Sequence, residues 1–317
     1  MFRDTTRRNA ILVPFIVASS GCIRKRAGLT VGFSQMENNN PWRIAQTNSL
    51  KTEAARRVNP YEIVITDAQS QTAKQVADVE DLIARRVSAL FLAPREFEGL
   101  APALESAKEA KIPVFLIDRE AEGKAGEDYV TFLGSDFIKQ GQRVADWLIR
   151  HTGGRASIVE LTGTAGSSVA RDRSQGFASR IKTERAMRII ASQNADFSRA
   201  TAQSVMENIV QARRSEITAV YAHNDEMALG AIQALKSAGL RPGKDVTVVS
   251  VDGEKAALEA VMRGDIGATA ESNPRFGPLA FDTLERYRRG EKIPPRITLE
   301  DNFFDASNAA RYVADAY

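Results

Sequence analysis

Short apolar runs alternate with longer amphipathic stretches through most of the 317 residues. The runs are rich in β-branched residues, have strand length and do not alternate apolar with polar, which is typical of parallel strands buried on both faces. They cover residues 29–33, 61–65, 89–92, 114–117 and 129–133, then 156–161, 188–191, 219–222 and 246–251. This alternation predicts strand–helix–strand units and parallel sheets.

The stretches between the runs carry a helical period. Within residues 72–87, apolar side chains recur every three or four residues and share one helical face. The same spacing precedes Gly239, which we expect to cap the end of that helix. Because the units form two series of about five, the sequence predicts an α/β protein with two similar lobes.

Composition agrees with two globular domains and gives no sign of a polyanionic partner. Hydrophobic residues make up 43% of the chain and charged residues 26%. The formal net charge is +3, and residues 1–21 contribute +2 from three arginines and one aspartate, which leaves 3 − 2 = +1 for the remainder. We therefore expect neither nucleic acid nor an anionic membrane as a partner.

The N-terminus has the parts of a secretory signal. Arginines precede a nine-residue apolar run at 10–18, and small residues follow it up to Gly21. Nine residues cannot span a bilayer, which needs about 20. Pro14 and Asp4 depart from the signal pattern, and a buried strand or a tail is the alternative. We expect residues 1–28 to be a signal and tether, and the remaining protein to be exported to the periplasm.

Cys22 is the only cysteine of the chain, so no intramolecular disulfide can form. Its position after Gly21 resembles a bacterial lipoprotein cleavage site, although that pattern prefers leucine where this chain has Ser19. Two interpretations stay open: a lipid anchor on Cys22, or a cysteine inside a discarded signal peptide.

Polar side chains follow the apolar runs, where open α/β sheets bind their ligands. In chain order they are Ser34 and Gln35, Asp67 and Gln69, Asp118 and Arg119, the loop 162–166 leading to Arg173, His223, Asn224 and Asp225, and Asp252. A sugar hydroxyl both donates and accepts, so it pairs well with a carboxylate on one side and a guanidinium or amide on the other. Trp42 and Phe197 are candidates to pack against the ring.

Each of these residues also has a simpler interpretation. Asp118 could form a loop ion pair with its neighbour, Asp252 could belong to a turn, and Trp42 could be a core residue. Asn224 and Asp225 could be helix N-caps, and we expect this of Asp225. The number of such sites, all at strand ends, favours a binding cleft.

Five segments together resemble the periplasmic sugar-binding proteins of the ribose-binding type, over residues 29 to about 305. They are 39–43 (Asn-Asn-Pro-Trp-Arg), 114–119, 170–173 with Gly176 and Phe177, 224–231, and 249–253. Within that family, residues 31–35, 42–43, 196–197 and 221–225 are most similar to those of its galactofuranose-binding members.

The resemblance implies a type I periplasmic binding protein: two Rossmann-like parallel-sheet lobes joined by three hinge crossings, with the sugar in the cleft. The lobes would be 29–134 plus 272–298, and 135–271 plus 299–317. The implied sugar contacts from both lobes are Asn40, Trp42, Arg43, Asp118, Arg119, Arg173, Phe197, Asn224 and Asp252.

Two departures from ribose binders concern the sugar. Arg43 stands where ribose binders have an aromatic residue, which indicates a ligand with an extra hydroxyl or another ring presentation. Ser272 stands where they have a glutamine before a proline, and we expect Glu271 beside it to be the galactofuranose-type counterpart. The resemblance thus implies a galactofuranose-like monosaccharide, or another pentose or hexose, rather than ribose.

The resemblance implies a solute-binding protein that delivers a monosaccharide to the membrane permease of an ABC importer, and we expect it to be a monomer. An enzyme is disfavoured because His151 and His223 are the two histidines and no nucleophile–base or metal spacing is present. No nucleotide motif or cofactor site is recognisable either. A lac-repressor-type regulator would need a DNA-binding segment of about 50–60 residues before Leu29, where this chain has 28. A sugar sensor for a membrane receptor stays open.

Overall fold

The computed structural model describes Met1 and residues 29–317. Apart from Met1, the expected signal segment, Cys22 included, falls outside the described residues. Among the helices of residues 29–317, none is long and apolar enough to cross a membrane.

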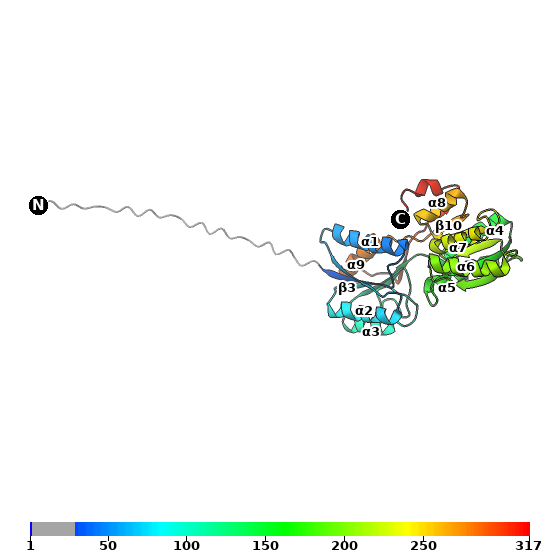
Figure 1. The fold of residues 1–317 in the computed structure, drawn as a ribbon. Helices are drawn as coiled ribbons and strands as arrows, with labels where there is room; N and C mark the ends of the chain where they lie inside the picture. The colour runs from blue at the N-terminus through cyan, green and yellow to red at the C-terminus, as the bar shows by residue number, and fades with distance from the viewer. Residues whose placement is uncertain (2–28) are drawn as a thin grey trace.

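The first lobe is a six-stranded parallel sheet in the order β11-β5-β4-β3-β1-β2. Its strands are β1 (Thr30–Gln35), β2 (Glu62–Asp67), β3 (Ala89–Ala93), β4 (Val114–Ile117), β5 (Thr131–Gly134) and β11 (Arg296–Thr298). One face is covered by α1 (Pro41–Arg56) and α9 (Gly277–Arg288), and the other by α2 (Thr72–Ala84) and α3 (Ala101–Glu109), as Figure 1 shows.

The second lobe repeats this plan with the order β12-β10-β9-β8-β6-β7. Its strands are β6 (Arg155–Thr162), β7 (Ala186–Asn194), β8 (Ala219–Ala222), β9 (Thr247–Asp252), β10 (Ala268–Glu271) and β12 (Phe303–Asp305), of which β12 runs antiparallel to β10. Its helices are α4 (Phe137–Thr152), α5 (Ser168–Ile181), α6 (Arg199–Arg213), α7 (Asp225–Ser237), α8 (Lys255–Arg263) and α10 (Ala309–Tyr312). The predicted two-lobed α/β fold is confirmed.

Strand β3 shows why the apolar runs are continuous. Ala89, Phe91 and Ala93 belong to the core under α1 and α9, whereas Leu90 and Leu92 belong to the core under α2 and α3. Successive strand residues point to opposite faces, so a strand covered on both sides needs an apolar residue at every position.

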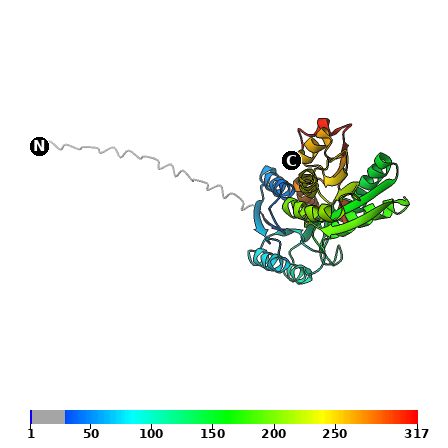
Figure 2. The same ribbon diagram turned by 45° about the vertical axis from the view of Figure 1, so that its right-hand side comes forward.

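The chain passes between the lobes three times. The first crossing lies at Ser135, between β5 and α4; the second is 272–276, between β10 and α9; and the third is 299–302, between β11 and β12. The C-terminal segment lies at the junction of the lobes in both views (Figure 1, Figure 2). There, Arg275 of the second crossing donates a hydrogen bond to the Asp315 carbonyl.

The two lobes are closed against each other. The Phe97 amide of the first lobe donates to the Gly166 carbonyl of the second at 2.9 Å. The Glu120 amide donates to Ser168 Oγ, also at 2.9 Å. Arg171 places its guanidinium carbon 5.1 Å from the Phe97 ring centre. These contacts close one side of the space between the sheets.

Candidate ligand-binding site

A cavity lies between the lobes, at the carboxyl ends of both sets of strands. It holds about 340 Å³ of empty space, part of it open to solvent. Its walls are Glu37, Asn40, Trp42, Arg43, Asp118, Arg119, Val169, Arg173, Phe197, Asn224, Asp252 and Ser272. All but one of the ten residues that we expected at the ligand line it, and the exception is Glu271.

On the first lobe, the wall is built from the start of α1 and the end of β4. Asn40 caps α1 by accepting a hydrogen bond from the Arg43 amide at 2.9 Å, and Pro41 occupies the first turn, where its missing N–H costs no hydrogen bond. The Arg43 side chain therefore leaves the first turn toward β4, where its Nη1 lies 2.7 Å from Asp118 Oδ2. Its guanidinium carbon lies 4.5 Å from the ring centre of Trp42.

The second lobe repeats this pair of groups. Arg173 comes from α5, the helix that follows β6, and its Nη2 lies 3.4 Å from Oδ1 of Asp252 at the end of β9. Its Nη1 donates to the His223 carbonyl at 2.5 Å and its Nε donates to Gln140 Oε1 at 3.0 Å. Each lobe therefore presents a buried carboxylate and a buried guanidinium to the same cavity.

Arg119 is the most buried of the cavity arginines, with 2% of its surface exposed. Its Nη1 donates to the Arg95 carbonyl at 2.7 Å, but its Nε has no hydrogen-bond partner among the described residues. Burial lowers the pKa of Arg119 to about 10, with the Arg43 charge acting in the same direction and Asp118 opposing it. The side chain is therefore still cationic at neutral pH, and it holds a buried donor that a hydroxyl could satisfy.

Phe197 supplies an apolar surface to the cavity. An added Cβ at Gly163 would lie 1.9 Å from the tip of the Phe197 ring, so the ring can pack here because residue 163 is glycine. The guanidinium carbons of Arg119 and Arg173 lie 5.2 and 6.0 Å from the ring centre. The Phe197 backbone has a φ of 54°, which a bulky residue rarely adopts.

Two cavity carboxylates also have unusual backbones. Asp118 has a φ of 67° and Asp252 has a φ of 136°. Residues held in such regions cluster at ligand sites, where surrounding structure compensates for the strain. Burial raises the pKa of Asp252 well above its ordinary range, and the nearby Arg173 charge opposes this only in part. Donors from a bound ligand would stabilise the charged form.

Asn224, and not Asp225, is the residue that caps the start of α7. Asn224 is the N-cap of α7, with its Oδ1 accepting from the Met227 amide at 2.9 Å, and it also lines the cavity. The prediction that Asp225 is the cap was wrong: it is the first residue of the helix, and its carboxylate accepts from the hydroxyls of Ser250 and Thr269. These hydroxyls come from neighbouring strands, which the local sequence does not reveal.

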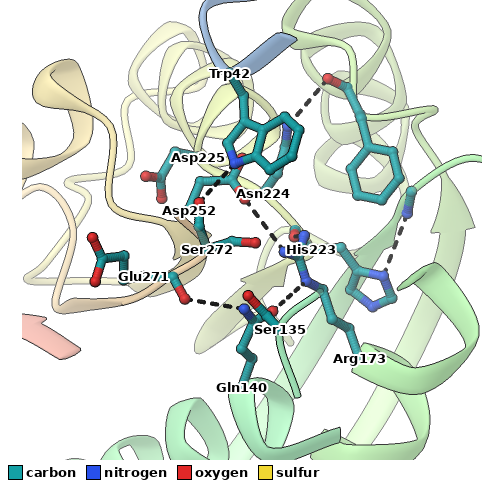
Figure 3. Close-up of polar contacts among 12 residues, drawn as sticks. Trp42, Ser135, Gln140, Arg173, His223, Asn224, Asp225, Asp252, Glu271 and Ser272 are labelled. Carbon is teal, nitrogen blue, oxygen red and sulfur yellow. Dashed lines mark hydrogen bonds and ion pairs between the residues drawn. The ribbon is translucent and has the colours of Figure 1, made fainter. Parts of the chain in front are cut away.

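Glu271 does not lie in the cavity wall. Its carboxylate accepts from the amide and the side chain of Asn302 at 2.8 and 2.6 Å, which ties β10 to the third crossing. Ser272 takes the place in the wall, and its carbonyl accepts from Trp42 Nε1 at 2.7 Å (Figure 3). Figure 3 shows the Glu271 side chain pointing away from Arg173.

The sequence analysis missed two further wall residues. Glu37 lies just after the end of β1, and its carboxylate accepts from Ser70 Oγ at 2.7 Å. Its signal was its place two residues beyond a strand end. Val169 is an apolar residue in the first turn of α5 and carries no signal that separates it from the core.

The side chains in the cavity wall suit the recognition of a small polar ligand. Carboxylates, guanidinium groups and aromatic rings at fixed positions match a small ligand with several hydroxyls and an apolar face. In the described part of the chain, no group of three or more His, Cys, Asp or Glu side chains is placed to hold a metal ion.

Comparison with known proteins gives the family. A family model described as periplasmic binding protein domain matches residues 31–292. The chain is 40% identical to the galactofuranose-binding protein of Escherichia coli strain K12, over 92% of each chain. It is 36% identical to the ribose import binding protein of Bacillus subtilis strain 168, over 85% of each chain.

The chain is also similar to a protein of known structure. The binding component of the arabinose ABC transporter from Shewanella sp. ANA-3, bound to α- and β-L-arabinofuranose, superposes with a TM-score of 0.87 at 38% identity. The match covers 90% of this chain and 95% of that one. With the two lobes, the three crossings and the cavity between them, these matches show that the chain belongs to the periplasmic binding proteins of the ribose-binding type.

Proposed function

We propose that this protein binds a monosaccharide in its furanose ring form and delivers it to an ABC importer. We expect it to bind galactofuranose more tightly than ribose. The observation that carries the proposal is the cavity itself. Buried carboxylates and guanidinium groups from both lobes face one space of monosaccharide scale, with Trp42 and Phe197 in its walls.

The sugar contacts in this proposal are the nine wall residues expected from the sequence, together with Glu37 and Ser272. Charged hydrogen-bonding groups suit hydroxyls, and the unpartnered Nε of Arg119 is a donor available to the ligand. Glu271 would then act on the hinge through Asn302 rather than on the sugar.

Arg43 supports a furanose with an exocyclic diol. It is held by Asp118 at the cavity wall, so its remaining donors have a fixed direction. A hexose in furanose form carries a diol on its side chain, and ribofuranose does not. Two of the relatives described above bind furanoses by name, which supports the furanose ring form; of the two sugars, galactofuranose carries the exocyclic diol and arabinofuranose does not.

Closure of the lobes would be the signal to the importer. For the moving units we propose residues 29–134 with 272–298, and 135–271 with 299–317. A ligand shifts such an equilibrium only by binding the closed form more tightly, and contacts divided between two lobes supply that difference.

Export belongs to the same proposal. The segment 1–21 has the order of a signal peptide, and Cys22 follows it directly. Intact mass of the protein from the native membrane fraction tests this: removal of residues 1–21 is expected, and an added diacylglyceryl mass would place a lipid on Cys22. An unprocessed chain that starts at Met1 would contradict export.

A thermal-shift screen against monosaccharides and nucleosides tests the ligand class. Furanose-forming hexoses should raise the melting temperature more than L-arabinose or ribose, whose furanose forms carry no exocyclic diol, because a ligand that binds the folded state more tightly stabilises it more. A rise with nucleosides alone would contradict a sugar site.

A further inference from the structure

Gln140 lies outside the cavity wall, yet its side chain reaches a cavity residue and the hinge together. It comes from the first turn of α4, directly after the first crossing, and 1% of its surface is exposed. Its Oε1 accepts from Arg173 Nε at 3.0 Å. Its Nε2 donates to the Glu271 carbonyl at 3.0 Å and to Asp301 Oδ2 at 2.8 Å. Figure 3 shows Gln140 between Arg173 and the Glu271 carbonyl.

Asp301 extends this contact to the remaining crossing. Its other carboxylate oxygen, Oδ1, accepts from Ser135 Oγ at 3.0 Å. Ser135 lies in the first crossing, Glu271 ends β10 at the second, and Asp301 lies in the third. The buried Gln140 amide thus contacts groups at the second and third crossings directly, reaches the first crossing through Asp301, and accepts from Arg173 on its opposite side.

The amide can satisfy these partners in one orientation only. A carboxamide has two N–H donors and one oxygen, and here both kinds of group are in use. A flipped amide would direct its N–H groups at the Arg173 guanidinium, which has no acceptor, and its oxygen at the Glu271 carbonyl and the Asp301 carboxylate. Because the group is buried, each mismatch would cost a hydrogen bond that no water replaces.

We infer that Gln140 is a positioning residue that couples Arg173 to the hinge. This inference rests on the proposed sugar-binding function. Closing the lobes changes backbone angles at the crossings, which moves the Glu271 carbonyl and the Asp301 carboxylate that hold the amide. The amide in turn sets the direction of Arg173, so a sugar bound to Arg173 and the closed hinge stabilise each other. Such coupling is reciprocal.

Gln140→Glu tests the hinge contacts of the amide separately from its contact with Arg173. A carboxylate keeps the acceptor for Arg173 but sets lone pairs against the Glu271 carbonyl and Asp301. We expect sugar affinity to fall tenfold or more, and small-angle scattering at saturating sugar to show less compaction than for the unsubstituted protein. Adding Asp301→Asn supplies a donor toward position 140 and should recover a large part of the affinity.

Ser135→Ala is the second variant, because Gln140→Glu could fail to fold. It removes only the bond to Asp301 Oδ1 and should weaken binding severalfold in the same direction. Thr283→Val is the control: Thr283 is buried in α9, and its hydroxyl donates to the Leu279 carbonyl in the same helix. It should lower the melting temperature and leave affinity unchanged.

Hydrogen exchange without sugar tests the hinge part alone. In Gln140→Glu, the amides of Ser272 and Asn302, bonded to the Asp252 carbonyl and the Glu271 carboxylate, should exchange faster. Gln140 is merely structural if affinity stays within twofold of the unsubstituted value, if Asp301→Asn brings no recovery, or if exchange at the crossings is unchanged. Absence of sugar binding by the unsubstituted protein would contradict the proposed function, while the exchange result would still decide the coupling to the hinge.

Discussion

Arg43 and Asp118 form a buried ion pair in the cavity wall, with Arg43 Nη1 2.7 Å from Asp118 Oδ2. Arg173 and Asp252 form the corresponding pair in the second lobe at 3.4 Å. Burying charge is costly unless it is paired, so each pair lowers the cost of burying its own two groups before a ligand arrives. A sugar then joins two prepared half-sites.

The cavity arginines carry the first prediction. Arg119→Ala and Arg173→Ala should each weaken sugar binding by about 2 kcal/mol or more, because each removes a charge-assisted hydrogen bond and leaves a buried partner unpaired. Calorimetric titration measures the loss. Arg180→Ala is the control, since Arg180 lies on the same helix as Arg173, is exposed and pairs with Asp146. If melting temperature falls and affinity stays, these arginines serve the fold alone.

Trp42 should set the affinity for sugars in general, whereas Arg43 should set the preference for one sugar over another. Trp42→Ala should lower the affinity for all sugars by a similar factor, because it removes an apolar surface and the hydrogen bond to the Ser272 carbonyl. Arg43→Phe should narrow the preference for sugars with an exocyclic diol, since a pocket built for a polar group discriminates against ligands that lack it. Asp118→Asn is measured alone and together with Arg43→Phe, so that the effect of Arg43 on the ratio is the difference between these two variants. Titrations with galactose and ribose compare the variants, and an unchanged ratio in the Arg43 variant would count against this role.

Ser168 tests closure away from the cavity wall. Its Oγ accepts from the Glu120 amide of the opposite lobe at 2.9 Å, so the bond belongs to the closed form. Ser168→Ala should reduce affinity severalfold, about 1 kcal/mol for one hydrogen bond. The melting temperature of the sugar-free protein should change little if its lobes are open. Equal affinity in both proteins would show that this contact does not help to hold the lobes closed.

His223 predicts a pH dependence of stability. Its ring is buried, Nδ1 accepts from the Gly163 amide at 3.4 Å, and Nε2 lies 3.1 Å from Glu160 Oε1. Burial lowers the pKa of His223 below its ordinary 6.5, although Glu160 opposes the shift. The unfolded state therefore binds the proton more readily. The neutral, buried His223 ring therefore contributes fully to the free energy of unfolding above pH 6.5, and this contribution is lost as the pH falls below 6.5.

Thermal unfolding between pH 7.5 and 5 measures this contribution. The melting temperature of the unsubstituted protein should fall more steeply than that of His223→Gln. His151→Gln should follow the unsubstituted protein, because His151 stacks on Trp147 at an exposed position of α4. Parallel curves for the unsubstituted protein and His223→Gln would contradict the assignment.

Much of the fold could be predicted because buried parallel strands need continuous apolar runs. The expected strands 114–117 and 219–222 coincide with β4 and β8. Strands β11 and β12 were missed because they have three residues each, and β11 is an edge strand with exposed polar ends. Strand β10 has four residues, as β4 and β8 do, but Thr269 and Glu271 interrupt its apolar run.

The site could be predicted where a side chain ends a strand, as Asp252 does, or follows one directly, as Asp118 does. Glu271 and Ser272 show the limit: successive residues of extended chain point in opposite directions, so one position decides which of them meets the cavity. Gln140 shows another limit. Its partners Arg173, Glu271 and Asp301 lie 33, 131 and 161 residues away in the chain, and no local pattern brings them together.

Calorimetric titration of the exported protein with galactose and with ribose, under the same conditions, tests the central claim most directly. We predict one site per chain, saturable binding of galactose through its furanose form, and weaker binding of ribose. The galactose affinity should be reduced in proportion to its small furanose fraction, so furanose-enriched ligand should bind more tightly. Ribose binding as tightly as galactose, or a nucleoside binding where neither sugar does, would contradict the account.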